Sequence, residues 1–285
     1  MLYFLLFFSV FLETAKTVIA NLFSKQELKQ DCDIFKFNWV FYIGSCIILL
    51  FFPLALPSAY TIGLAALFAL ITTASQYFCL QALRSGPMSL TTFLQGSSLL
   101  IPTFFGFLFM NETASPIFWI SLVFLLIAMG LVLISKRESI SLKWLLLSFG
   151  TFLFTGGIGI MQSVQQASAY SDELTPFLLI SFAFCALFNF AGQLIVHKTS
   201  PAPSFPFRSR TTVLALGSGA AMGAVNLINL YLSGAMDKHI FFPIVNGGLI
   251  FLTTVAAFLF FRERLTRRQW IGLALGIVTL AVIAL

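Results

Sequence analysis

Apolar stretches long enough to cross a bilayer recur along the whole chain, and this feature limits the possible folds more than any other. A transmembrane helix needs about 20 predominantly apolar residues. Charged residues make up only 9% of the sequence, compared with about 25% in a soluble protein. The sequence therefore predicts an all-α integral membrane protein without a sizeable extramembrane domain. The predicted transmembrane helices are ten in number: 2–23, 35–53, 60–83, 87–109, 115–134, 142–169, 175–197, 211–233, 239–261 and 267–285.

The chain contains an internal repeat. When residues 95–134 are placed on 246–285 without gaps, nine of the 40 positions are identical. About three or four identities are expected from the shared apolar composition alone. The match of Glu112 with Glu263 and a matched pair of Trp residues carry most weight, because both residue types are scarce in this chain. Internal repeats in a hydrophobic chain are typical of transporters.

Each predicted repeat holds five spans, with residues 1–134 in the first and 142–285 in the second. An odd number of spans makes the second copy cross the membrane in the opposite direction. The charges agree with this interpretation, because the loop at 111–115 has no basic residue and its repeat partner at 262–268 has four. Basic residues favour cytoplasmic loops, so we expect the odd-numbered loops in the cytoplasm and both termini outside. Inverted repeats place a binding site near the midplane, between the halves.

Short motifs accompany this repeat. Arg-Glu-Arg-Leu-Thr at 262–266, followed by Trp-Ile-Gly at 270–272, resembles the Glu-x-Leu-Ser/Thr loop and Gly-bearing helix that close each EamA repeat. The first copy keeps the Glu and a hydroxyl at 112–115, but Ser121 takes the place of the Gly. Ala-Leu at 82–83 is similar to the pair that leads into the fourth helix of the family's repeat.

With its ten-span plan, the chain resembles the drug/metabolite transporter superfamily, in the ten-helix EamA-like branch. The resemblance implies a secondary transporter for small metabolites, amino acids, sugar-nucleotide conjugates or lipophilic cations. It also implies a central cavity lined mainly by helices 1, 3, 4, 6, 8 and 9.

Glu13 is the first candidate for a transport residue. It lies about eleven residues into the first span, near mid-depth for a rise of about 1.5 Å per residue. A carboxylate there costs about 2.5–3.5 kcal/mol, so we expect it to face a cavity or a partner. Removal from water favours its protonated form. A Glu in the first membrane helix is also similar to that of the small multidrug resistance proteins, where it binds protons and cationic substrates in competition.

Lys16 offers a different interpretation of Glu13. The two residues are three positions apart on one helix face, which favours an ion pair. A paired Glu13 stays charged and serves only to neutralise Lys16. The two interpretations are compatible, because a charge pair that faces the cavity would bind a zwitterion such as an amino acid.

Polar residues in other spans extend this candidate site. Gln95 and Asn246 occupy the same repeat position, each directly before a Gly. Spans 6 and 8 carry Gln and Asn at helical same-face spacing. The alternative role for such amides is interhelical hydrogen bonding, which contributes about 0.6 kcal/mol on average. The predicted substrate-binding residues are Glu13, Lys16, Gln95, Asn246, Gln162, Gln166, Asn226 and Asn229.

Two further patterns concern the helices themselves. Pro102, Pro243 and the glycines between 156 and 159 are typical of helix breaks, which can act as hinges or expose carbonyl groups. Four tryptophans near span ends are expected to anchor the chain at the membrane interface. They are Trp39, Trp119, Trp144 and Trp270.

Other function classes are less well supported by the sequence. Gly-Ser-Ser-Leu at 96–99, with His197 or His239 as base, loosely fits an intramembrane serine protease. The chain has no Gly-x-x-x-x-Gly-Lys-Ser/Thr motif and no His-Glu-x-x-His motif. A non-transporting membrane partner or receptor is the other alternative. We therefore expect no catalytic residue, no metal and no cofactor, and the four cysteines match neither a zinc site nor a disulfide framework.

The expected partners are a small-molecule substrate and the lipid bilayer. The net charge of +6 is spread over short loops, which fits an anionic membrane leaflet and not a nucleic acid. The stretch 2–23 has no basic N-terminal region and is interpreted as an uncleaved membrane helix, not a signal peptide. A multi-pass protein of a bacterial cytoplasmic membrane, monomeric or homodimeric, is the resulting expectation.

Overall fold

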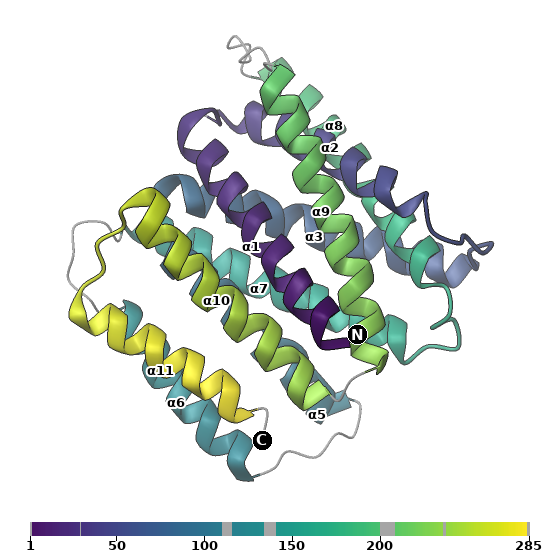
Figure 1. The fold of residues 1–285 in the computed structure, drawn as a ribbon. Helices are drawn as coiled ribbons and strands as arrows, with labels where there is room; N and C mark the ends of the chain where they lie inside the picture. The colour runs from purple at the N-terminus through teal and green to yellow at the C-terminus, as the bar shows by residue number, and fades with distance from the viewer. Residues whose placement is uncertain are drawn as a thin grey trace.

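The structure is a computed structural model, and all regular secondary structure among its described residues is helical (Figure 1). It describes residues 2–28, 30–109, 116–133, 141–199, 209–235 and 238–283. The helices are α1 (Leu2–Gln26), α2 (Asp31–Leu49), α3 (Ala59–Ser85), α4 (Met88–Ser97), α5 (Leu100–Phe109), α6 (Pro116–Leu133), α7 (Leu142–Gln166), α8 (Leu174–Thr199), α9 (Ser209–Ala235), α10 (Lys238–Phe261) and α11 (Arg267–Ile283). The predicted all-α class is confirmed. The loop at 111–115, used in the repeat comparison, lies outside the described residues.

Six of these helices are long and apolar enough to cross a bilayer. They are α1, α2, α3, α7, α8 and α9. A bundle with this many apolar helices is a multi-pass membrane protein, because apolar helices of this length satisfy their own backbone groups inside lipid.

Polar residues directly before several helices determine where these helices begin. Ser58 precedes α3, and its hydroxyl accepts a hydrogen bond from the backbone N–H of Thr61 at 3.2 Å. Ser141 has the same role for α7, where the N–H of Trp144 donates to its hydroxyl at 3.1 Å. Such caps satisfy backbone donors that have no partner within the helix.

The fourth predicted span is divided into α4 and α5. Pro102 lacks the N–H that would donate to the carbonyl of Ser98 in a continuous helix. That carbonyl instead accepts from the N–H of Ile101 at 3.0 Å, in a tighter turn. The helix is therefore interrupted at Ser98 and Leu99, just before Pro102, whereas α7 runs without interruption through its glycines and α10 through Pro243. Gly156 and Gly159 of α7 lie against Ile101 and Pro102, so these glycines make room for the close approach of α5.

Most of the extensive helix packing joins the two halves of the chain. Helix α2 packs against α8 and α9, α3 packs against α7 and α8, and α1 packs against α9 and α10. Helix α4 contacts α7 and α10, α5 contacts α7, and α6 lies along α11. Figure 1 shows α1 between α9 and α10, with the α6–α11 pair at one edge of the bundle.

The tightest crossing is between α2 and α9. A Cβ atom on Gly44 would overlap the backbone carbonyl of Leu216, and one on Gly219 would overlap that of Phe41. Ser45 also donates from its hydroxyl to the carbonyl of Gly219 at 2.8 Å. Small residues allow helix backbones to approach closely inside a membrane, where packing and hydrogen bonds replace the hydrophobic effect.

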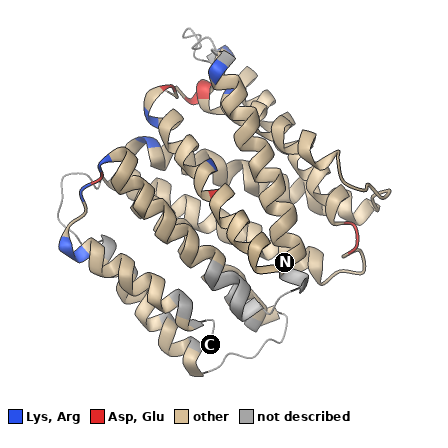
Figure 2. Cartoon of the chain, viewed as in Figure 1, with Lys and Arg blue, Asp and Glu red and all other residues tan. Residues whose placement is uncertain are grey.

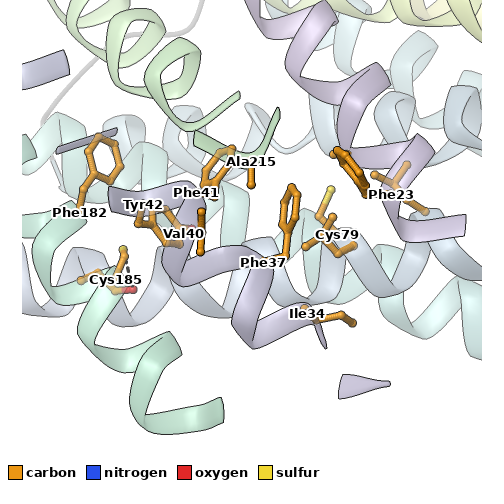
Figure 3. Close-up of a cluster of buried hydrophobic side chains, with 14 of the residues drawn as sticks. Phe23, Ile34, Phe37, Val40, Phe41, Tyr42, Cys79, Phe182, Cys185 and Ala215 are labelled. Carbon is orange, nitrogen blue, oxygen red and sulfur yellow. Dashed lines mark hydrogen bonds between the residues drawn. The ribbon is translucent and has the colours of Figure 1, made fainter. Parts of the chain in front are cut away.

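Buried apolar side chains form two main clusters. The larger one joins α1, α2, α3, α8 and α9, and Figure 3 shows its aromatic centre around Phe37, Phe41, Tyr42 and Phe182. The second joins the other helices and includes Trp144, which is fully buried. The prediction that Trp144 anchors the chain at the membrane surface is therefore wrong. Its ring N–H donates to the Thr91 hydroxyl at 2.9 Å, and this bond is available only inside the bundle.

Candidate functional site

An ion pair lies midway along α1. The Lys16 ammonium Nζ is 2.5 Å from Glu13 Oε1, and their side chains are only 9% and 15% exposed. The third charged residue of α1, Lys25, lies in its last turn, and Figure 2 shows that most Lys and Arg residues in view gather at the ends of helices. A charge inside a membrane protein is costly unless it is paired, and here each charge neutralises the other.

The ion pair continues into the second half of the chain through a row of polar contacts. Lys16 Nζ lies 3.3 Å from the sulfur of Met222 in α9. The Asn226 side-chain amide donates to the same sulfur at 3.3 Å. The Gln162 amide of α7 donates to Asn226 Oδ1, also at 3.3 Å. Four of the eight predicted site residues thus form one network, which spans α1, α9 and α7.

Residues of α3 and α4 form a second part of the site. The thiol of Cys79 in α3 is 3.8 Å from Gln95 Oε1 in α4, and α3 packs against α1, the helix that carries the ion pair. A Cβ on Gly96 would lie 3.9 Å from the backbone oxygen of Asn246. The two repeat-related amide positions therefore lie on α4 and α10 where these helices pack together.

Among the residues that the structure describes, no hydrogen bond connects Gln166 or Asn229 to this network. They lie farther along the same helices, and Gln166 Nε2 and Asn229 Oδ1 are buried without a hydrogen-bond partner. Asn21 and Asn38 are fully buried, and neither of their side-chain amide atoms has a partner. A buried polar atom without a partner is costly, so these four side chains leave hydrogen-bonding capacity unused inside the bundle.

The protease alternative requires the serine of the 96–99 match to lie beside His197 or His239. Ser98, the serine of the Gly-x-Ser-x match, is buried between α4 and α5. His197 is in the last turn of α8 and is exposed. The side chain of His239 lies outside the described residues.

A carboxylate outside the site connects three helix ends. Glu263, between α10 and α11, accepts hydrogen bonds from the backbone N–H of Met88 at 2.5 Å and of Ser89 at 3.2 Å. The Ser89 hydroxyl also donates to it at 2.7 Å. Lys25 of α1 is 3.8 Å away. A carboxylate at the start of a helix satisfies orphan backbone donors and interacts favourably with the helix dipole.

Sequence reasoning missed three residues of this arrangement. Met222 and Cys79 are apolar in type and lie within apolar stretches, so no sequence signal distinguishes them from packing residues. Glu263 was noticed for its match to Glu112, but a pattern of identities does not reveal which helix its carboxylate binds.

Comparison with known proteins gives little functional information. No family model matches the chain. A protein of Haemophilus influenzae, described as uncharacterised, is 26% identical over 188 residues, which cover 63% of this chain and 60% of the relative. The chain thus spans less than two thirds of that relative's length. A protein of known crystal structure, described only as a protein, superposes with a TM-score of 0.60 and 13% identity over 97% of both chains. This likeness concerns the fold alone.

Proposed function

We propose that the chain is a secondary transporter of a small polar or charged solute, of the drug/metabolite transporter type in its EamA-like branch. The observation that carries this proposal is the buried network that begins at Glu13 and Lys16 and ends at Gln162. It joins charged and amide groups from both halves of the chain inside an apolar bundle. A charge pair inside a membrane protein indicates a functional site by default.

The helix packing supports two inverted repeats of five spans. In the proposed topology, α4 and α5 together are span 4, and α6 to α11 are spans 5 to 10. When each span is exchanged for its counterpart in the other half, the packing of α2 with α9 becomes that of α8 with α3. Likewise, α3 with α7 becomes α9 with α1, and α1 with α10 becomes α7 with α4. The pairs α2–α8, α4–α10 and α6–α11 map onto themselves, as expected for helices on a two-fold axis.

The network has the chemistry that proton-coupled transport requires. A proton on Glu13 removes the negative partner of Lys16 and leaves the ammonium group free to bind a carboxylate or another anionic group of the substrate. When Glu13 loses this proton, its carboxylate pairs with Lys16 again and displaces the bound group of the substrate. Amides of Gln95, Gln162 and Asn226 provide neutral hydrogen-bonding partners around these charges.

Ligand-induced thermal stabilisation tests this function. The purified protein and the Glu13→Gln variant would be screened against amino acids, nucleosides, sugars and quaternary ammonium compounds. A ligand at about 100 times its dissociation constant should stabilise the folded protein by about 2.7 kcal/mol. We expect a hit for the wild type that is lost in the variant, and the same compound should drive proton flux in proteoliposomes. A chain with no hit and no flux for any class would contradict the proposal.

We also propose that the basic end of the bundle faces the cytoplasm, and that both termini lie outside. Cysteines introduced singly at Ser171, in the loop before α8, and at Arg264, before α11, would be labelled with an impermeant maleimide. In right-side-out vesicles of cysteine-free protein, Ser171→Cys should react and Arg264→Cys should not. The reverse pattern would overturn this orientation.

A further inference from the structure

Helix α4 is a ten-residue segment of the first half that is held mainly by residues of the second half. Its first turn is bound by Glu263, as described above. The Trp144 ring of α7 donates to its Thr91. Its Phe93 lies so close to α11 that a Cβ on Gly276 would overlap the ring. At its other end α4 stops before Leu100, where α5 begins, so the two segments do not form one continuous helix.

The same segment reaches the candidate site. Gln95, in its last turn, is in contact with Cys79 of α3, and α3 packs against α1, the helix that carries the Glu13–Lys16 pair. Movement of α4 away from α10 and α11 would withdraw Gln95 and expose this part of the site. The first turn of α4 lies at the basic end of the bundle, against Glu263, which is paired with Lys25, and its last turn reaches the candidate site through Gln95.

We propose that Glu263 is the latch of a gate at this basic end, and that release of its carboxylate from Met88 and Ser89 lets α4 move and opens the site on that side. The latch is a positioning device and does not itself bind substrate. Three hydrogen bonds to one carboxylate make it the strongest polar connection between α4 and the second half in the described part of the chain. Lys25 stabilises the charge of Glu263 from α1.

Cys79 provides a native reporter for this movement. It is 8% exposed in the closed arrangement and lies against Gln95 of α4. Replacing Cys32, Cys46 and Cys185 by Ala leaves Cys79 as the single thiol. Its reaction with an impermeant maleimide would be followed in inside-out and right-side-out vesicles, which distinguishes the two faces of the membrane.

In this background, Glu263→Gln should increase Cys79 labelling from the basic end about tenfold, because it loses charge-assisted hydrogen bonds that exceed neutral ones in strength. Ser89→Ala removes only one of these bonds and should give a smaller increase. Lys25→Gln should change labelling by no more than about twofold, because its partly exposed ion pair contributes little. Glu173→Gln is the matched control: it removes a carboxylate that caps α3 from the loop before α8, and it should leave labelling from the basic end unchanged.

Unchanged labelling in Glu263→Gln and in Ser89→Ala, in protein with a normal helical circular dichroism spectrum, would overturn the latch. An equal increase from both faces would also overturn it, because general loosening produces that result. The inference rests on the proposed transport function only in that it interprets the movement as gating. Because labelling needs no substrate, its failure would leave transport unaffected, and absence of transport with gated labelling would contradict the proposed function alone.

Discussion

Glu13 and Lys16 form a buried ion pair, and loss of either partner leaves an uncompensated charge inside the bundle. We expect Glu13→Gln and Lys16→Met each to destabilise the protein by about 3–5 kcal/mol. The double variant should recover most of this loss, because no charge then remains to be compensated. Thermal unfolding in detergent micelles would measure the effect. A double variant that is as unstable as the sum of the single variants would show that the two residues act independently.

Glu173 is a second carboxylate with a defined partner, at the start of α3. Hydrogen bonds from the Thr61 side chain and from the backbone and hydroxyl of Ser58 hold the pKa of Glu173 below its ordinary value. A depressed folded-state pKa contributes stability that is fully present above the unfolded-state pKa and is lost as the pH falls through the folded-state value. This loss should begin below about pH 4.5, the usual range for Glu.

The expected pH dependence is measured as the melting temperature between neutral and acid pH. Wild-type protein should lose more stability in acid than Glu173→Gln, because the amide does not titrate. Asp172→Asn, at the exposed neighbouring position, is the control and should follow the wild-type curve. Identical curves for wild type and Glu173→Gln would contradict the assigned role.

At the level of helices, the close approach of α2 and α9 depends on two glycines. A methyl group on Gly219 would overlap the backbone of Phe41, which cannot move away as a side chain could. We expect Gly219→Ala to destabilise the protein by at least about 1–3 kcal/mol. Gly217→Ala, two residues earlier in the same helix, is the matched control, because nothing lies within 4 Å of its added carbon. Equal melting temperatures for the two variants would show that the crossing is looser than described.

The helices were largely predictable from the sequence, and their partners were not. Apolar stretches predicted the six long helices that can cross a bilayer, and Pro102 predicted the interruption that directly precedes it, because these are local effects of hydropathy and of the missing N–H. Pro243 carries the same local signal, but α10 continues through it. The burial of Trp144 was not predictable, because a Trp near a span end suits both a membrane interface and a hydrogen bond to Thr91.

The candidate site likewise has a part that the sequence predicts and a part that it does not. The Glu13–Lys16 pair follows from their spacing of three residues within one helix. The contacts with Met222 and Asn226 depend on which face of α9 turns towards α1, and a membrane helix that is apolar on all sides carries no clear sequence signal for that face. The residues that join the two halves of the site could therefore be identified only from the tertiary packing.

For the whole molecule, the arrangement of contacts makes each half dependent on the other. The extensive helix pairs, such as α2 with α9, α3 with α7 and α6 with α11, connect 1–134 with 142–285. The packing within one half is much sparser among the described residues, so an isolated half would leave its close-packed small-residue faces without partners. Because interhelical packing and hydrogen bonds drive association in lipid, we expect the two halves to bind each other when they are produced as separate chains.

Co-expression of fragments 1–134 and 142–285, with an affinity tag on one of them, tests this dependence. The untagged fragment should co-purify in a one-to-one ratio, and each fragment alone should be degraded or aggregate. Gly219→Ala in the second fragment should lower the recovery of the first, because it disrupts the α2–α9 crossing between them, whereas Gly217→Ala should not. A first fragment that is monodisperse and protease-resistant by itself would mean that the halves fold as independent domains, and the intertwined packing would then be a consequence of their docking and not its cause.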